Sequence, residues 1–128
     1  MLSITETQGT ITLTLTAQAM GRGLNISLFG GDAPHIGAVA LAEPRSSLRA
    51  DGSLGATCSV LARLGHKEDE LARCVALEVA SRLNIVACVV CGIHVRDADE
   101  ESIRIVLALA DRLAHRLCEA APAGLRSP

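Results

Sequence analysis

The feature that most constrains the fold is an unbroken alternation of apolar and polar side chains from Thr10 to Ala19. Threonine occupies positions 10, 12, 14 and 16, and every position between them is apolar. A period of two places the apolar side chains on one face of an extended chain and the hydroxyl groups on the other. The run therefore predicts a β-strand that buries one face.

Similar alternation elsewhere predicts further strands. Residues 2–7 and 24–28 flank the first run, and glycines between them favour hairpin turns. Residues 42–55 contain proline, glycine and several polar side chains, and we expect them to form a long loop. The remaining strands are expected at residues 35–41, 57–64 and 85–95.

Two segments have the period of an amphipathic helix. The first covers residues 67–83, and the second begins near Asp97, where Glu100 three residues later resembles a capping box. In the second helix we expect the buried stripe to consist of Ile103, Val106, Leu107, Ala110, Leu113, Ala114 and Leu117.

The order of these elements predicts an α+β fold with two layers. We expect a mainly antiparallel sheet of about six strands with two helices packed on one face. A single domain should cover residues 1–120, followed by a disordered tail at 121–128 that contains proline and glycine. Because residues 85–95 are apolar on both strand faces, a second copy of the chain is expected to cover the other sheet face. We therefore expect a homodimer.

Composition excludes several classes of partner. Aromatic residues make up 1% of the chain and the formal net charge is -2, so neither base stacking nor phosphate attraction favours nucleic acid. We see neither a signal peptide nor an apolar run of about 18 residues, so we expect a cytoplasmic protein without a membrane partner. The five cysteines are scattered through apolar segments, which is typical of buried thiols in a reducing compartment.

The pair Cys88 and Cys91 has the spacing of a metal-binding or redox motif. On a strand, however, residues three apart point to opposite faces, and a second cysteine pair that would complete a zinc site is absent. We interpret both thiols as packing groups.

The densest group of chemically active side chains lies between Gly65 and Glu70. His66, Lys67, Glu68 and Asp69 stand in sequence just before or at the start of the first helix. A helix N-terminus beside a lysine attracts phosphate, whereas the carboxylates repel it. A divalent cation held by His66, Glu68 and Asp69 would allow a phosphate to bind beside these carboxylates. The alternative is that the acidic residues only stabilise the helix dipole.

Two more histidines lie beside glycines at expected strand ends. His35 follows the turn at Gly30 and Gly31, whose exposed amides suit an anion, and His94 shares a strand face with Gly92. The missing side chain at Gly92 would leave a floor beside the His94 ring. The three histidines at 35, 66 and 94 therefore predict one binding site, whereas His115 in the last helix is given no role.

Four short segments carry a resemblance to a known family. They are residues 30–40, 44–48, 65–72 and 92–95, which have the sequences GGDAPHIGAVA, PRSSL, GHKEDELA and GIHV. In this order they resemble the LpdD-like chaperones for prenylated flavin mononucleotide (prFMN), which are similar in fold to proteasome assembly chaperones.

The resemblance implies a non-enzymatic protein that binds reduced prFMN and helps to load it into a UbiD-type decarboxylase. The residues expected to bind the cofactor are Gly30, Gly31, His35, His66, Lys67 and His94. His66, Glu68 and Asp69 are expected to act as metal ligands or as partners of a ligand. Two alternatives stay open: a protein-only assembly chaperone or structural subunit of a decarboxylase, and a metal-dependent hydrolase or lyase at the same histidines.

Overall fold

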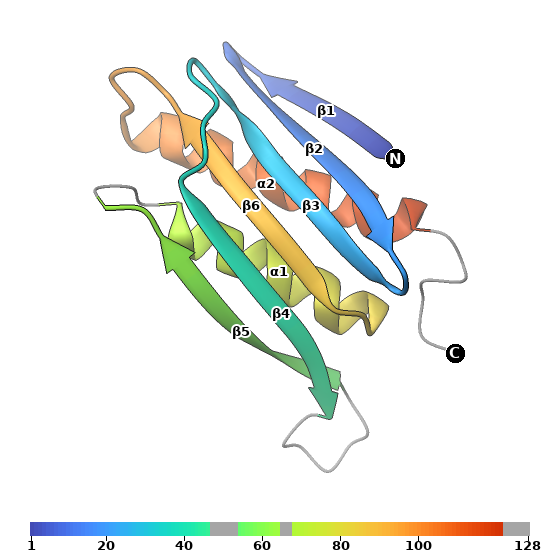
Figure 1. Ribbon diagram of the computed structural model, residues 1–128. Coiled ribbons are helices and arrows are strands. Elements are labelled where there is room, and N and C mark those ends of the chain that lie inside the picture. Colours follow the sequence, from blue (N-terminus) through green and yellow to red (C-terminus); the bar gives the residue numbers. More distant parts are fainter. Residues whose placement is uncertain (47–53, 65–67, 122–128) are drawn as a thin grey trace.

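The computed structural model describes residues 1–46, 54–64 and 68–121 (Figure 1). Within these ranges the chain forms one six-stranded sheet and two helices. In chain order the elements are β1 (Leu2–Gln8), β2 (Ile11–Met20), β3 (Gly23–Gly31), β4 (Ala38–Ser46), β5 (Leu54–Ala62), α1 (Asp69–Leu83), β6 (Ala87–His94) and α2 (Glu100–Ala120).

The strands are arranged in the order β1-β2-β3-β6-β4-β5. Every neighbouring pair is antiparallel except β3 and β6, which are parallel. Both helices lie on the same face of the sheet, where α1 packs against β4, β5 and β6, and α2 packs against β1 and β2 (Figure 1). This arrangement confirms the predicted α+β fold with two helices on one side.

The core lies between the sheet and the helices. The strand predicted from the alternation between Thr10 and Ala19 is confirmed, because Leu13 and Leu15 are fully buried while Thr12 is exposed. From the helix side, Leu109, Leu113 and Leu117 close the same core. Aliphatic side chains and the thiols of Cys91 and Cys118 therefore fill the described core, as the near-absence of aromatic residues required.

The structure corrects the predicted loop at residues 42–55. β4 continues to Ser46 through Pro44, which pairs with Ala56 of β5. β4 contacts β6 only as far as Ala42, so beyond that point it has a neighbour on one side alone. Proline is tolerated where one strand edge needs no amide donor. The centre of the predicted loop, residues 47–53, lies outside the described residues.

Three other element ends differ from the prediction. β4 begins at Ala38 rather than at residue 35, and α1 begins at Asp69 rather than at residue 67. α2 begins at Glu100, and its cap is Asp99 instead of Asp97, because the Asp99 carboxylate accepts a hydrogen bond from the Ser102 amide.

The predicted tail lies almost entirely outside the described residues. Ala121, its first residue, is described and is buried against the core. Among the described helices, none has the length and apolarity needed to cross a bilayer.

Candidate functional site

The connection from β3 to β4 crosses over β6, because β6 lies between these two strands in the sheet (Figure 1). Backbone hydrogen bonds fix this crossing segment, residues 32–37, at both ends. The Asp32 amide donates to the His94 carbonyl at 2.6 Å, and the Gly37 amide donates to the Cys91 carbonyl at 2.9 Å. In addition, the Arg96 amide donates to the Asp32 carboxylate at 2.7 Å. His35 is therefore held over the end of β6.

Glycines let the crossing segment lie directly on the sheet. A Cβ atom at Gly92 would overlap the backbone of His35, and one at Gly31, where φ is +74°, would overlap the His94 carbonyl. The open floor that the sequence suggested above Gly92 is thus filled by the protein's own backbone. Gly30 has a similar packing role, because a Cβ atom there would overlap the Thr12 carbonyl.

His35 forms an ion pair with Glu68, the residue that precedes α1. Its Nε2 atom lies 2.7 Å from Glu68 Oε1, and the two side chains are 22% and 12% exposed. On the other side of the ring, Nδ1 lies 3.0 Å from the Ala33 carbonyl oxygen. Both ring nitrogens therefore have an oxygen atom within hydrogen-bonding distance, which fixes the orientation of the ring.

A cavity of about 870 Å³ extends from this ion pair along the groove between α1 and α2. His35, Glu68 and His94 line one end of it. Much of its wall is apolar and consists of Leu71, Val75, Ile93, Val95, Ile103, Val106 and Leu107. A cavity of this size with an apolar wall and a few polar groups is typical of a site for a small organic ligand.

The groove corrects the predicted buried stripe of α2. Ile103 and Leu107 are 54% and 52% exposed, whereas Leu109 and Leu113 are fully buried. The apolar surface of α2 is therefore wider than the core requires, and its N-terminal part lines the cavity. The sequence indicated this groove only through the width of the apolar stripe, because the core alone needs a narrower one.

Both helices begin at the end of the sheet where β6 ends (Figure 1). At the start of α2, hydrogen bonds from Ser102 hold the pKa of Asp99 below its ordinary value. Helix N-termini favour anionic ligands. The carboxylates of Glu68, Glu70, Glu78 and Asp111 line the cavity, however, and lysine and arginine are absent from its described lining. An anionic ligand would therefore need a cation beside it.

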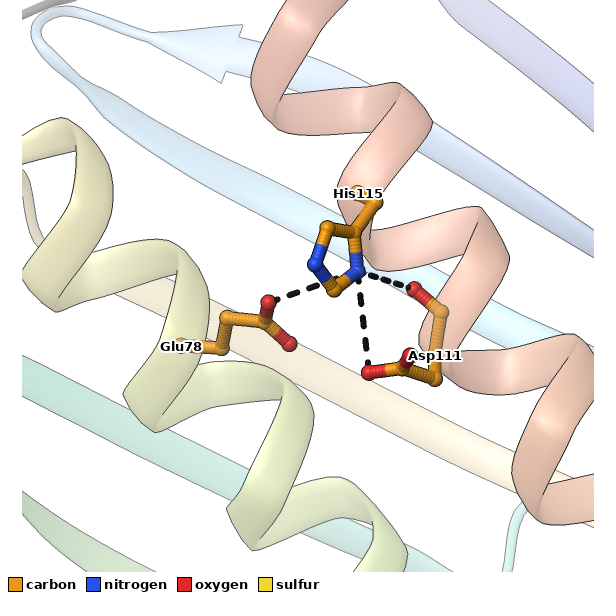
Figure 2. Close-up of side chains that lie close together, drawn as sticks. All are labelled: Glu78, Asp111 and His115. Carbon is orange, nitrogen blue, oxygen red and sulfur yellow. Dashed lines mark hydrogen bonds and ion pairs between the residues drawn. The ribbon is translucent and has the colours of Figure 1, made fainter.

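A second polar group lies where α1 and α2 run side by side, farther along the helices (Figure 2). Glu78 of α1 and Asp111 of α2 line the cavity, and His115 lies one turn after Asp111. The Nδ1 atom of His115 lies 2.8 Å from the Asp111 carbonyl oxygen and 3.6 Å from a carboxylate oxygen of each acidic residue. The hydrogen bond to Asp111 and the charge of Glu78 raise the pKa of His115. Sequence reasoning missed this group, since only the packing of α1 beside α2 brings Glu78 to the other two.

The predicted site residues fall into three groups. His35 and Glu68 are in contact, and His94 lines the same end of the cavity. Asp69 is exposed in the first turn of α1 and, like Gly30 and Gly31, is not part of the cavity wall. His66 and Lys67 lie outside the described residues.

The cysteines support the packing interpretation. Cys91 is fully buried and Cys88 is half-buried on β6, and burial raises the pKa of Cys91 to about 12. Cys74 lines the cavity, but burial and the neighbouring Glu70 raise the pKa of its thiol as well. Neither Cys91 nor Cys74 therefore has the lowered pKa of a reactive thiolate.

Comparisons with known proteins identify a family. A sequence model of the family described as "Prenylated flavin chaperone LpdD-like domain" matches residues 7–121. The curated proteins contain no match to the chain. Among solved structures, the chain is similar to one titled "Crystal Structure of a Novel Chaperone Complex for Yeast 20S Proteasome Assembly", with 16% identity and a TM-score of 0.48. This match covers 91% of the present chain and 99% of the other, and no functional conclusion follows from it.

Proposed function

Because the chain belongs to the family of prenylated flavin chaperone LpdD-like domains, we propose that it binds reduced prFMN and delivers it to a UbiD-type decarboxylase of aromatic acids. The protein acts as a carrier and performs no chemical step on the cofactor. The observation that best supports this role is the cavity of about 870 Å³ between α1 and α2.

The cavity suits the two chemically different ends of the cofactor. Its apolar wall, formed by residues such as Leu71, Val106 and Leu107, fits the ring system and the added prenyl-derived carbons. The end with His35 and His94 lies where both helices begin, so it is the end that favours the phosphate. His66 and Lys67 directly precede Glu68 in sequence, and we assign them to this end as well.

The carboxylates at this end require a compensating charge. A divalent cation bound by His66, Glu68 and Asp69 would link the acidic first turn of α1 to the phosphate, as the residue types allow. Glu68 also lies 2.7 Å from the His35 ring, which holds its carboxylate at this end of the cavity. Phosphate binding then depends on a small number of charged groups.

A carrier must also release its ligand. The Ile103 and Leu107 side chains remain about half exposed at the groove, so the cofactor would be covered incompletely. Incomplete burial limits affinity and leaves the ring accessible to a partner protein. We therefore expect prFMN to leave through the groove between the helices when the decarboxylase docks.

The test is anaerobic titration of the purified protein with reduced prFMN, followed by native mass spectrometry. We expect the wild-type chain to retain one flavin. Val106→Asp places a charge in the apolar wall and His35→Ala removes the ion pair, so each should weaken retention by about tenfold or more, since about 1.4 kcal/mol corresponds to a factor of ten.

The matched control is Met20→Asp, which adds the same charge at an exposed residue of β2 outside the cavity wall and should leave retention unchanged. Circular dichroism checks that all variants are folded. A wild-type chain that retains no flavin, with or without added divalent metal, would refute the proposed function.

A further inference from the structure

The group formed by Glu78, Asp111 and His115 brings three metal-ligand side chains together from two helices (Figure 2). One ligand atom from each residue lies within 4.8 Å of the other two. Asp111 and His115 are four residues apart on α2, which places them on one face of that helix. Glu78 approaches from α1, so the group spans the interface between the helices.

The Nδ1 atom of His115 lies at the centre of this group. Three oxygen atoms surround it: the Asp111 carbonyl oxygen at 2.8 Å, and Asp111 Oδ1 and Glu78 Oε1, each at 3.6 Å. Nδ1 donates its proton to the nearest of them, the backbone carbonyl. Figure 2 shows that the Asp111 oxygens lie on one side of the ring and Glu78 on the other, so carboxylates flank the imidazole from both helices.

The spacing of these atoms is close to what a metal ion requires. Zinc bound tetrahedrally at about 2.0–2.2 Å sets neighbouring ligand atoms about 3.3–3.6 Å apart. The two 3.6 Å separations from Nδ1 already lie at the edge of this range. The side chains of Asp111 and His115 are 66% and 48% exposed, so small rotations towards an entering ion meet little resistance.

We propose that Glu78, Asp111 and His115 bind a divalent transition-metal ion such as Zn²⁺. One imidazole and two carboxylates are ligand types that this class of ion accepts, and water completes the coordination. The bound ion links α1 to α2 and neutralises two of the carboxylates that line the cavity. The ion lies farther along the helices than the end of the cavity that His35 and Glu68 line. The proposal does not depend on flavin binding.

Two groups compete with the metal. The first is the proton on His115 Nδ1, which a metal ion bound at this atom must displace to Nε2 or to the solvent. The second is the guanidinium of Arg82. Arg82 Nη1 lies 3.4 Å from Glu78 Oε1 and forms an ion pair within α1. A metal ion must displace the guanidinium from this oxygen before Glu78 can act as a ligand. Removal of the Arg82 charge should therefore strengthen metal binding, whereas loss of a ligand should weaken it.

The experiment uses Zn²⁺ alone, added to the metal-free full chain without flavin. Isothermal titration calorimetry should show one bound equivalent that persists in His66→Gln, a variant that removes a ligand of the cation site proposed at the start of α1. Replacing the residues that support a metal ligand typically costs about 10–100-fold in affinity, so His115→Gln and Glu78→Gln should each lose at least about tenfold. Arg82→Gln should bind at least as tightly as the wild type.

Two controls separate this site from other ligands in the chain. His35→Gln removes a histidine at the other end of the cavity, and Glu101→Gln removes an exposed carboxylate of α2; both should bind Zn²⁺ like the wild type. Co²⁺ substitution should give an absorption spectrum without thiolate bands. Absence of binding, equal affinity in the wild type and His115→Gln, or thiolate bands from cysteine ligation would each overturn the proposal.

Discussion

At the scale of single residues, one end of the cavity is built from side chains that three separate segments supply. His35 comes from the β3–β4 connection, His94 from the end of β6, and Glu68 from the residue before α1. The residue types of segment 32–37 do not show that it crosses β6, so the sequence suggested open space above Gly92. In the structure, Gly92 is the point where two backbones touch.

This contact leads to a prediction for Gly92→Ala. The new methyl group would overlap the His35 backbone, which cannot rotate away as a side chain can, so residues 33–37 must shift. We expect the free energy of unfolding to fall by about 1–3 kcal/mol, the usual cost of overpacking. Urea denaturation measures this change, and native mass spectrometry should show weaker retention of prFMN.

Gly55→Ala provides the matched control on β5. Its added methyl group would first meet the end of the flexible Arg45 side chain at 3.4 Å, so stability should change by no more than about 0.5 kcal/mol. Equal stability of the Gly92→Ala variant and the wild type would contradict the tight backbone contact.

At the scale of elements, periodicity located each helix and strand but not all of their ends or exposures. The stripe from Ile103 to Leu117 correctly predicted α2, yet its first part lines the cavity between α1 and α2 and stays about half exposed. Pro44 and the polar residues around it predicted a loop, whereas β4 continues because its free edge tolerates proline. The end of an element and the exposure of its side chains depend on the elements that pack against it. The element's own sequence carries no information about these neighbours.

The N-terminus of α2 allows a prediction about pH. Hydrogen bonds from Ser102 to the Asp99 carboxylate lower the pKa of Asp99 in the folded chain. The stabilisation is therefore present above the unfolded-state pKa of about 3.9. It is lost as the pH falls through the lower pKa of the folded state.

We expect Asp99→Ala to lower the melting temperature at neutral pH, because two donors of Ser102 lose their acceptor. The difference from the wild type should shrink in strong acid, where Asp99 is protonated in both states. Thermal denaturation followed by circular dichroism across this pH range provides the measurement, with Glu101→Ala as a control in the same helical turn. A difference that stays constant from neutral to strongly acidic pH would show that the charge of Asp99 is not involved.

At the scale of the whole molecule, the sequence predicted the layers but not the strand order. Alternation shows which residues face the core, and it contains no information on which strand lies beside which. The parallel pairing of β3 with β6 is the step that brings the ends of these strands and the starts of both helices to one edge. The cavity depends on this topology, which explains why its residues were predicted only in part.

The predicted homodimer would form through the sheet face that the helices leave uncovered. Leu61, Val39 and Val90 form a row across β5, β4 and β6 on that face, and Leu41 extends it. Leu61 and Leu41 are 78% and 48% exposed, which is unfavourable for apolar side chains in water. A second copy that packs on this row would bury them.

Sedimentation velocity should therefore show a dimer for the wild-type chain and a monomer for the double variant Leu41→Lys/Leu61→Lys, because two buried, unpaired ammonium groups per chain would oppose association. Met20→Lys changes an exposed apolar residue of the β2–β3 hairpin outside the row and should remain dimeric. A wild-type chain that sediments as a monomer at micromolar concentration would exclude the homodimer. If the double variant still binds prFMN, the cavity between the helices functions within one chain, as its position on the opposite side of the sheet requires.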